Sequence, residues 1–356
     1  MVGANGASMF LLLGCTGEKP VDDTGGEWSP IGIGDGTPGS VGWTSILGPE
    51  DDLHDPRDLG FDAAGNLWIA NRVDDHTFIV FEPGTDAQSF ERRQDGYASH
   101  FMEETAAFSF DGDAQMGSCG ESNNTYDDTV RGNGYMGPVL WSTDLEIFGV
   151  ENPIGLGSHL DMTHESPLCV GIAWETANVY WVFDGRHRAL VRNDFQRDHG
   201  VGMDEHFDSI VHRLTEPEVK RVEEAPGHLV IDHTTGLLYA ADTGNGRVLW
   251  VDTATGSEGE ALPANDPGVV NVEWDGAEWG ELSTAFEEPG ALAFDGTTLY
   301  VGDWATGVIT ALDLSGNALR TLDTGFGAEK LYGMEFGPDG HLWVIDNASG
   351  VYRIDP

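Results

Sequence analysis

Apolar and polar positions recur along this chain in units of three short runs. Within residues 225–252, one apolar run ends at Asp232, a second ends at Asp242, and a third begins at Arg247. Turn residues separate these runs. Apolar runs this short, joined by tight turns, predict β-strands paired as an antiparallel meander.

Six copies of this unit are present. Aligned on the residue four positions before the acidic turn, they carry Asp58, Ala107, Gly171, His228, Ala291 and Gly333. Six repeated meanders predict an all-β fold, a six-bladed β-propeller. The last copy shows only three strands, and an isolated strand-like run at 40–47 precedes the first copy. We expect this N-terminal run to complete the last blade and close the ring, because closure removes exposed sheet edges.

The N-terminal residues predict export. A short apolar run at 9–13 is followed by Gly14 and Cys15, which resembles the bacterial lipobox, in which the cysteine is lipidated. We therefore expect a lipoprotein signal peptide at 1–15, a flexible acidic tether at 16–39 and the propeller at 40–356, in an exported protein of the bacterial cell envelope, periplasmic or at the outer surface. Residues 1–10 lack Lys and Arg, so either the true signal starts earlier or the segment is only an apolar tail.

Two cysteines remain once Cys15 is assigned to lipid. Cys119 falls at the end of the second strand of one repeat, and Cys169 at the start of the first strand of the next. In a meander these two ends lie on the same face, so a disulfide between neighbouring blades is expected in an oxidising compartment. Two separate buried thiols are the alternative.

The charge of the chain limits the kinds of partner that it can bind. With 61 acidic against 17 basic residues, the formal net charge is -44. Nucleic acid and anionic membrane surfaces would be repelled, so we expect neither as a partner, and membrane contact only through the lipid on Cys15. The carboxylates either form a solvated surface or hold divalent cations, and both are compatible. We expect a monomer that binds an unidentified small molecule or protein.

The repeats resemble NHL repeats, and the ring is similar to six-bladed NHL propellers. The segments SHLDMTHESPLCVGIAWE and DHGVGMDEHFD also resemble exported bacterial NHL proteins. The group includes the peptidyl-hydroxyglycine amidating lyase and is close to gluconolactonase-type propellers. The resemblance implies a zinc site whose histidines precede the inner strands. The matching positions here are Arg57 and Gly227, with His228 one residue later, and a one-residue shift turns a strand side chain to the opposite face.

One face of the ring is expected to carry the loops that lead into the inner strands and those between second and third strands. Six residues are its candidate metal ligands, for zinc or copper: His54, Asp58, His159, Asp161, His164 and His228. The candidates for ligand binding on the same face are Arg57, Asp184, His187, Asp242, Asp303 and Trp304. Hydrogen-bonded loop histidines without a metal are the alternative.

A second cluster follows the third strand of the third repeat, where it should open on the opposite face. Its members are Asp198, His199, Asp204, His206 and Asp208. Oxygen donors and glycines in one short loop suit calcium, whereas a solvated acidic loop is the alternative.

These patterns favour a metal-binding propeller that acts as a ligand- or protein-binding module. A metal-dependent lyase or lactone hydrolase is the alternative function, with the ion as Lewis acid. A purely structural ring, whose ions brace loops, is a third. The chain has no nucleophile-elbow, phosphate-loop or dinucleotide-binding pattern, so serine hydrolase and nucleotide chemistry have no support.

Overall fold

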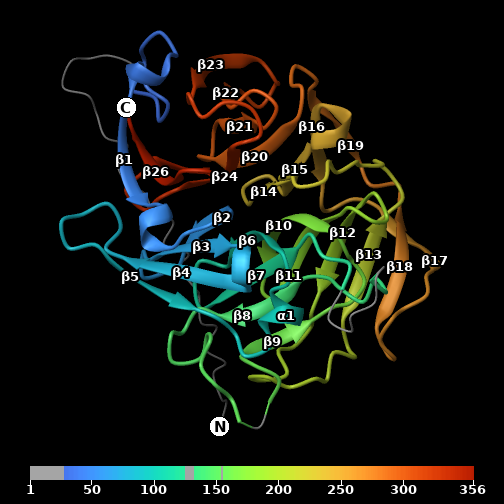
Figure 1. Cartoon of the computed structure of the whole chain (residues 1–356). Helices are drawn as coiled ribbons and strands as arrows, with labels where there is room; N and C mark the ends of the chain where they lie inside the picture. Colours follow the sequence, from blue (N-terminus) through green and yellow to red (C-terminus); the bar gives the residue numbers. More distant parts are fainter. Residues whose placement is uncertain (1–27, 125–131, 154) are drawn as a thin grey trace, which may run out of the picture.

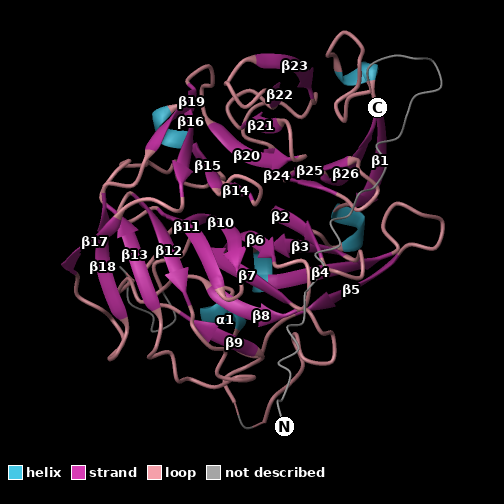
Figure 2. Cartoon of the chain, turned by 180° about the vertical axis from the view of Figure 1, so that it is seen from behind, coloured by secondary structure: helices cyan, strands magenta, loops and turns pink. Residues whose placement is uncertain are grey.

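Six β-sheets are arranged around a common axis in the computed structural model, which describes residues 28–124, 132–153 and 155–356. The inner strands β2, β6, β10, β14, β20 and β24 surround the centre of the ring (Figure 1). Strands dominate, and the helical elements are single turns (Figure 2). The prediction of an all-β, six-bladed propeller is confirmed.

Each blade is a meander whose first strand lies innermost. Blade 1 consists of β2 (Pro56–Phe61), β3 (Leu67–Asn71), β4 (His76–Phe81) and β5 (Ser89–Arg93). Blade 2 consists of β6 (Thr105–Phe110), β7 (Gln115–Gly120), β8 (Val139–Ser142) and β9 (His159–Met162). Blade 3 consists of β10 (Cys169–Thr176), β11 (Val179–Asp184), β12 (Ala189–Asp194) and β13 (Ile210–Leu214). Blade 4 consists of β14 (Leu229–Asp232), β15 (Leu237–Asp242), β16 (Arg247–Asp252) and β19 (Trp279–Ser283). Blade 5 consists of β20 (Pro289–Phe294), β21 (Leu299–Asp303), β22 (Val308–Leu312) and β23 (Ala318–Asp323). Blade 6 consists of β24 (Leu331–Phe336), β25 (Leu342–Asp346), β26 (Gly350–Asp355) and β1 (Gly42–Leu47). Between blades 1 and 2 lies the short helix α1 (Ala98–Phe101).

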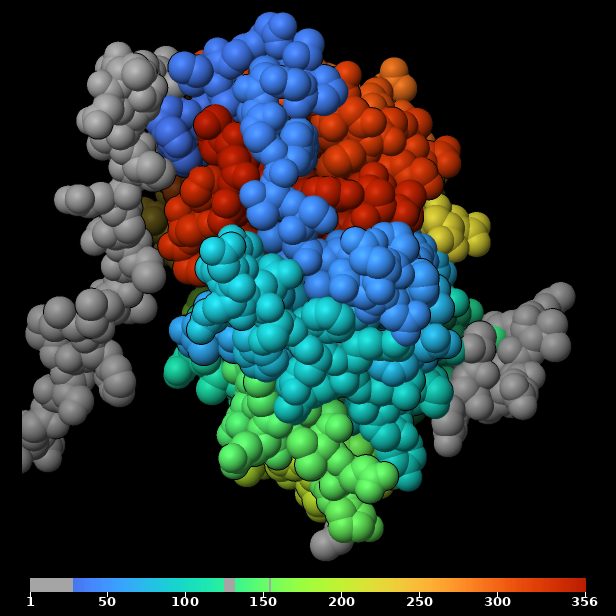
Figure 3. Space-filling model, turned by 60° about the vertical axis from the view of Figure 1, so that its left-hand side comes forward, coloured from blue at the N-terminus to red at the C-terminus, as the bar shows by residue number. Residues whose placement is uncertain are grey.

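The N-terminal strand closes the ring as expected. β1 pairs antiparallel with β26, with Trp43 opposite Ile354. In the space-filling view the N-terminal residues in blue lie directly against the C-terminal strands in red (Figure 3). Packing extends further towards the N-terminus than predicted, because Ile31, inside the expected tether, is only 1% exposed and belongs to an apolar cluster with Ala293 and Ile354.

The insertion between β16 and β19 extends a neighbouring blade. It contributes β17 (Ser257–Ala261) and β18 (Val270–Asp275), and β18 pairs in parallel with β13, so that the third sheet has six strands. This pairing covers the edge of β13, which the four-stranded blade would leave open. The sequence did not predict it, because the insertion is rich in Gly and Glu and lacks a clear alternation.

The inner strands are crowded, in agreement with the small residues aligned there. A Cβ atom on Gly171 would lie 2.1 Å from the carbonyl oxygen of Gly227, and one on Gly333 would lie 2.8 Å from Oδ1 of Asp58.

Cys119 on β7 and Cys169 on β10 form a disulfide, with Cα atoms 5.7 Å apart, which joins blades 2 and 3. No helix within the described residues is long and apolar enough to cross a membrane. Cys15 and the signal expected at 1–15 lie outside those residues.

Candidate metal centre

The histidines and aspartates expected on one face do not all meet in one axial pocket. His54 is largely exposed, with its Nε2 3.3 Å from Asp52. Asp184, Asp242 and Asp303 end the second strands of their blades, where their carboxylates accept local backbone N–H groups. Nδ1 of His187 lies 2.7 Å from Asp184. These contacts brace loops, which is the physical reason for Asp recurring at this point of the repeat.

The axis on this face is filled by the segment that leads into β14. Arg57 is only 5% exposed and donates hydrogen bonds to the backbone oxygen and the Oε2 of Glu224, at 2.6 and 2.7 Å. Its guanidinium lies 4.8 Å from the ring centre of Tyr332, beside which Trp304 and Ala225 are packed. Hydrogen bonds from Arg72 and Arg57 lower the pKa of Glu224 to about 2. Arg57 and Trp304 are therefore engaged within the protein rather than lining an open pocket.

An axial cavity of about 310 Å³ opens towards the opposite face. Among its lining residues are Asp58, His228 and Glu335, with phenyl rings such as Phe61 and Phe294 further along. Nδ1 of His228 lies 3.8 Å from Oδ1 of Asp58. Burial raises the pKa of Asp58 to about 8 and that of Glu335 to about 7, and it lowers the pKa of His228 to about 4. The cavity thus holds neutral or weakly charged acid and base groups.

Parts of the two predicted clusters, expected on opposite faces, come together instead at the outer rim of the ring: His159, Asp161 and His164 of the first lie beside the second. β9 is the outermost strand of blade 2, and the chain between β12 and β13 runs beside it. The backbone N–H groups of His199 and Gly202 donate to the carbonyl oxygens of Leu160 and His159, at 3.2 and 2.7 Å. This pairing brings the residues of DHGVGMDEHFD against β9, which loop positions in the sequence could not reveal.

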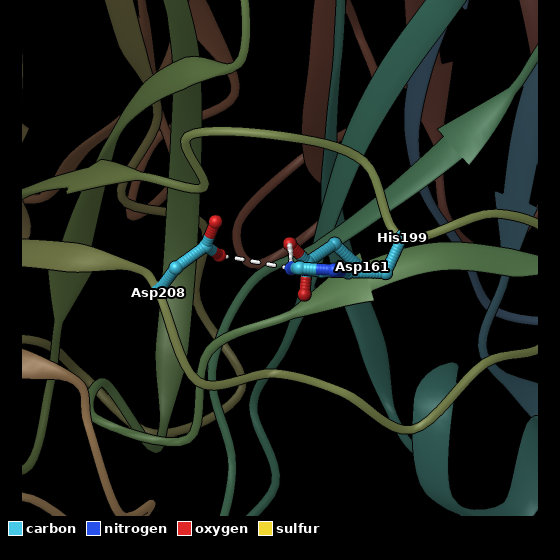
Figure 4. Close-up of side chains that lie close together, drawn as sticks. All are labelled: Asp161, His199 and Asp208. Atoms are coloured by element: carbon cyan, nitrogen blue, oxygen red, sulfur yellow. Dashed lines mark hydrogen bonds and ion pairs between the residues drawn. The ribbon is translucent and has the colours of Figure 1, made fainter.

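Asp161, His199 and Asp208 form a group whose possible ligand atoms all lie within 4.8 Å of one another. It is the one such group of three found among the described residues. Nε2 of His199 lies 2.8 Å from Asp208 and 3.6 Å from Oδ2 of Asp161. The three side chains point toward one another, Asp161 from β9 and the other two from the neighbouring loop (Figure 4). A His/Asp cluster that could hold a metal ion is therefore present.

The burial of this group is graded from inside to outside. The Asp161 side chain is fully buried, whereas those of His199 and Asp208 are 12% and 31% exposed. Burial raises the pKa of Asp161, and a hydrogen bond with His206 opposes that shift. Oδ2 of Asp161 is buried without a hydrogen-bond partner. A carboxylate oxygen in this state costs free energy unless a cation or donor reaches it.

Apart from His54, Asp58 and His228, which lie elsewhere, the other predicted ligands divide into two sets. Asp198 and Asp204 are exposed and outside the group. His159, His164 and His206 are buried next to it, and Nδ1 of His206 lies 2.9 Å from Oδ1 of Asp161. Three neighbours of these rings were not predicted from the sequence: His100, Tyr135 and Asp266. The sequence shows the H-x-x-x-x-H spacing of His159 and His164. His100 and Asp266 lie 64 and 102 positions from His164, so no local pattern links them to it.

The comparisons with known proteins found similar folds among solved structures. No family model and no curated protein matches the chain. The luciferin-regenerating enzyme aligns with a TM-score of 0.53 at 13% identity, over 89% of this chain and 95% of that one. A structural genomics protein of unknown function from Bacteroides thetaiotaomicron VPI-5482 gives 0.52 at 9% identity, over 85% and 70%. A chain of the nidogen/laminin complex gives 0.51 at 14%, over 80% and 85%.

At these identities the likeness shows the fold alone. The class of protein is a six-bladed β-propeller with a His/Asp cluster at its rim. Membership of the NHL family stays a prediction.

Proposed function

We propose that this protein is a metal-binding propeller of the bacterial cell envelope, which serves as a binding module. The observation that carries the proposal is the approach of Asp161, His199 and Asp208 within 4.8 Å of one another. Their mixture of one imidazole and two carboxylates suits a borderline ion such as zinc. Calcium prefers six to eight oxygen ligands. The exposed Asp198 and Asp204 do not join the group, so its oxygen ligands are too few to favour calcium.

The proposal also explains an unsatisfied group. Oδ2 of Asp161 is buried without a hydrogen-bond partner, and it lies on the side of His199. A bound cation would neutralise and coordinate it, while the hydrogen bond between Oδ1 and His206 would orient the carboxylate. The partial exposure of Asp208 provides a route by which an ion can enter.

Export and lipid anchoring through Cys15 are part of the proposal. They are supported by the lipobox-like sequence and by the Cys119–Cys169 disulfide, which is typical of oxidising compartments. The chain's surplus of acidic residues keeps it away from nucleic acid and makes cations the natural partners.

The alternative function, a metal-dependent lyase or lactone hydrolase, has one observation in its favour. Asp58, His228 and Glu335 line the axial cavity, where perturbed carboxyl and imidazole groups could exchange protons with a ligand. However, the Asp161 group lies at the rim and does not line that cavity. A metal-assisted reaction needs ion and base at one place, so the binding module is the better-supported function.

Metal content of the purified protein tests this function. After incubation with zinc and dialysis, we expect bound zinc in the parent protein, and one equivalent less in His199→Ala and in Asp208→Asn, because each removes a ligand. Mass spectrometry of the metal gives the ratio directly. His54→Ala, at an exposed histidine, and Asp198→Asn, in the same loop as Asp208, are matched controls that should keep the parent content. Equal content in all five proteins would refute the site.

A further inference from the structure

Four imidazole rings are gathered beside the Asp161 group. They belong to His100 on α1, His159 on β9, His164 after β9, and His206 in the loop before β13. Ring centres are 5.5 Å apart for His100 and His164, 5.6 Å for His164 and His206, and 5.3 Å for His206 and His159. Rings bound through Nε2 to one tetrahedral ion lie about 5 Å apart by the same measure, given metal–nitrogen bonds of about 2.0–2.1 Å.

The hydrogen bonds of two rings fix which nitrogen can bind a metal. Nδ1 of His159 faces the carbonyl oxygen of Leu156 at 2.8 Å, and Nδ1 of His164 faces Asp266 at 2.6 Å. Because these partners are acceptors, each Nδ1 carries the proton and each Nε2 keeps its lone pair. Nδ1 of His206 lies 2.9 Å from Asp161 and also accepts the backbone N–H of Met162 at 3.2 Å. An Nδ1–H bound to a carboxylate or carbonyl is the usual arrangement behind a metal-ligating histidine.

The pair formed by His100 and His164 has the spacing of two ligands of one ion. Their Nε2 atoms are 3.4 Å apart. This separation is long for a hydrogen bond between nitrogens. It equals the distance of about 3.3–3.4 Å that separates two nitrogens on a tetrahedral zinc ion. Asn124 also forms a hydrogen bond with the His100 ring, which contributes to its orientation.

The surroundings bury these rings. His159 is fully buried, and its ring centre lies 3.7 Å from that of Phe101. His164 is only 2% exposed. Imidazoles that are already removed from water lose little further solvation when they bind a cation.

We propose that Nε2 atoms of His100 and His164 hold a second metal ion, zinc or copper, with His206 as third ligand and His159 beside it. This inference rests on the proposed function, because the second position is joined to the first by one hydrogen-bonded unit. Asp161 offers Oδ2 to the first ion, and its Oδ1 lies 2.9 Å from Nδ1 of His206. Ion binding would draw the His206 ring towards the His100–His164 pair, and the two ions together would form a two-metal rim centre.

A second layer of residues holds His164 in place. Asp266, in the loop between β17 and β18, accepts from Nδ1 of His164 and from the hydroxyl of Tyr135 at 2.5 Å. The Tyr135 ring stacks on His164 at 3.6 Å between centres. The insertion that extends blade 3 therefore delivers the carboxylate that orients this ligand, which gives the insertion a role in the site.

Counting bound ions tests the second position. The full chain is stripped with a chelator and titrated with zinc by equilibrium dialysis. We expect two equivalents in the parent protein, one in His164→Ala, one in His199→Ala and two in His54→Ala. With copper(II), nitrogen hyperfine structure in the electron paramagnetic resonance spectrum should weaken in His164→Ala and persist in His199→Ala, because the imidazole-rich position is then the one retained.

Two further results separate this proposal from the proposed function. One equivalent in the parent protein that His199→Ala abolishes and His164→Ala leaves unchanged would overturn the second position alone. One equivalent lost only in His164→Ala would overturn the Asp161 site instead. Asp266→Asn guards against misfolding, because it keeps every ligand: it should retain two equivalents and bind the second ion about 10–100-fold more weakly. Unchanged affinity in Asp266→Asn would contradict its orienting role.

Discussion

At the scale of single residues, a carboxyl group predicted to bind metal is used inside the ring. Asp58 accepts backbone N–H groups from Leu59 at 2.9 Å and from Phe108 at 2.8 Å, so it ties the inner strands of blades 1 and 2 together. Glu335 and His228 line the same cavity. Because burial acts in opposite directions on acids and bases, the three groups give the stability of the protein a distinct pH dependence.

The free energy of unfolding should fall as the pH rises from about 6.5 to 8. The folded-state pKa values of Asp58 and Glu335 are about 8 and about 7, above the ordinary 3.8 and 4.5. Between about pH 6.5 and 8 the folded state therefore still holds protons that the unfolded state has released, and it loses this advantage as the pH rises. His228, lowered from 6.5 to about 4, destabilises the fold only below pH 6.5. Each proton by which the folded and unfolded states differ changes the free energy of unfolding by up to about 1.4 kcal/mol per pH unit.

Chemical denaturation across this pH range measures the slope. Asp58→Asn should flatten it, whereas Asp86→Asn, at an exposed residue, should leave it unchanged. Parallel curves for the parent protein and Asp58→Asn would show that Asp58 is ionised in the folded state.

At the scale of elements, the His/Asp cluster at the rim depends on contacts between segments of different blades. β9 closes blade 2, the loop after β12 lies against it, and the β17–β18 insertion reaches the turn that follows β9. The disulfide joins the same two blades nearer the axis, from β7 to β10. It therefore limits how far blades 2 and 3 can separate, and with them the ligands that each supplies.

Removing the disulfide should destabilise the propeller. It closes a loop with a sequence separation of 50 residues, and cross-links of this kind contribute about 2–4 kcal/mol. We expect the Cys119→Ala, Cys169→Ala double variant to lose this amount of unfolding free energy in urea denaturation. The parent protein under reducing conditions should behave like the double variant. A double variant as stable as the oxidised parent would show that the bond contributes nothing.

At the scale of the whole molecule, the ring is closed by its two ends. β1 and β26 share a sheet, so the N-terminal strand lies beside the C-terminus (Figure 2). A propeller tethered at one point can present the His/Asp cluster at its rim and its axial cavity to the surrounding medium. The net charge of -44 would then keep it clear of anionic lipid headgroups.

Lipid on Cys15 should decide where the protein is found. In a bacterial host we expect the parent chain in the membrane fraction, released by detergent, because burial of acyl chains contributes about 0.8 kcal/mol per methylene. Cys15→Ser should appear in the soluble envelope fraction, with Cys119→Ala as a control that stays in the membrane. The same distribution for the parent and Cys15→Ser would exclude the anchor.

The sequence by itself determined the blades, their number and the closing strand, and it favoured a bond between Cys119 and Cys169. These follow from apolar runs and turns close together in the chain, and from the order in which meanders must pack. The tertiary structure decided which side chains meet. His164 reaches Asp266 across 102 positions, and Asp161 reaches His206 across 45. Those contacts depend on β9 being an outer strand and on an insertion folding onto a neighbouring blade, so no local pattern records them.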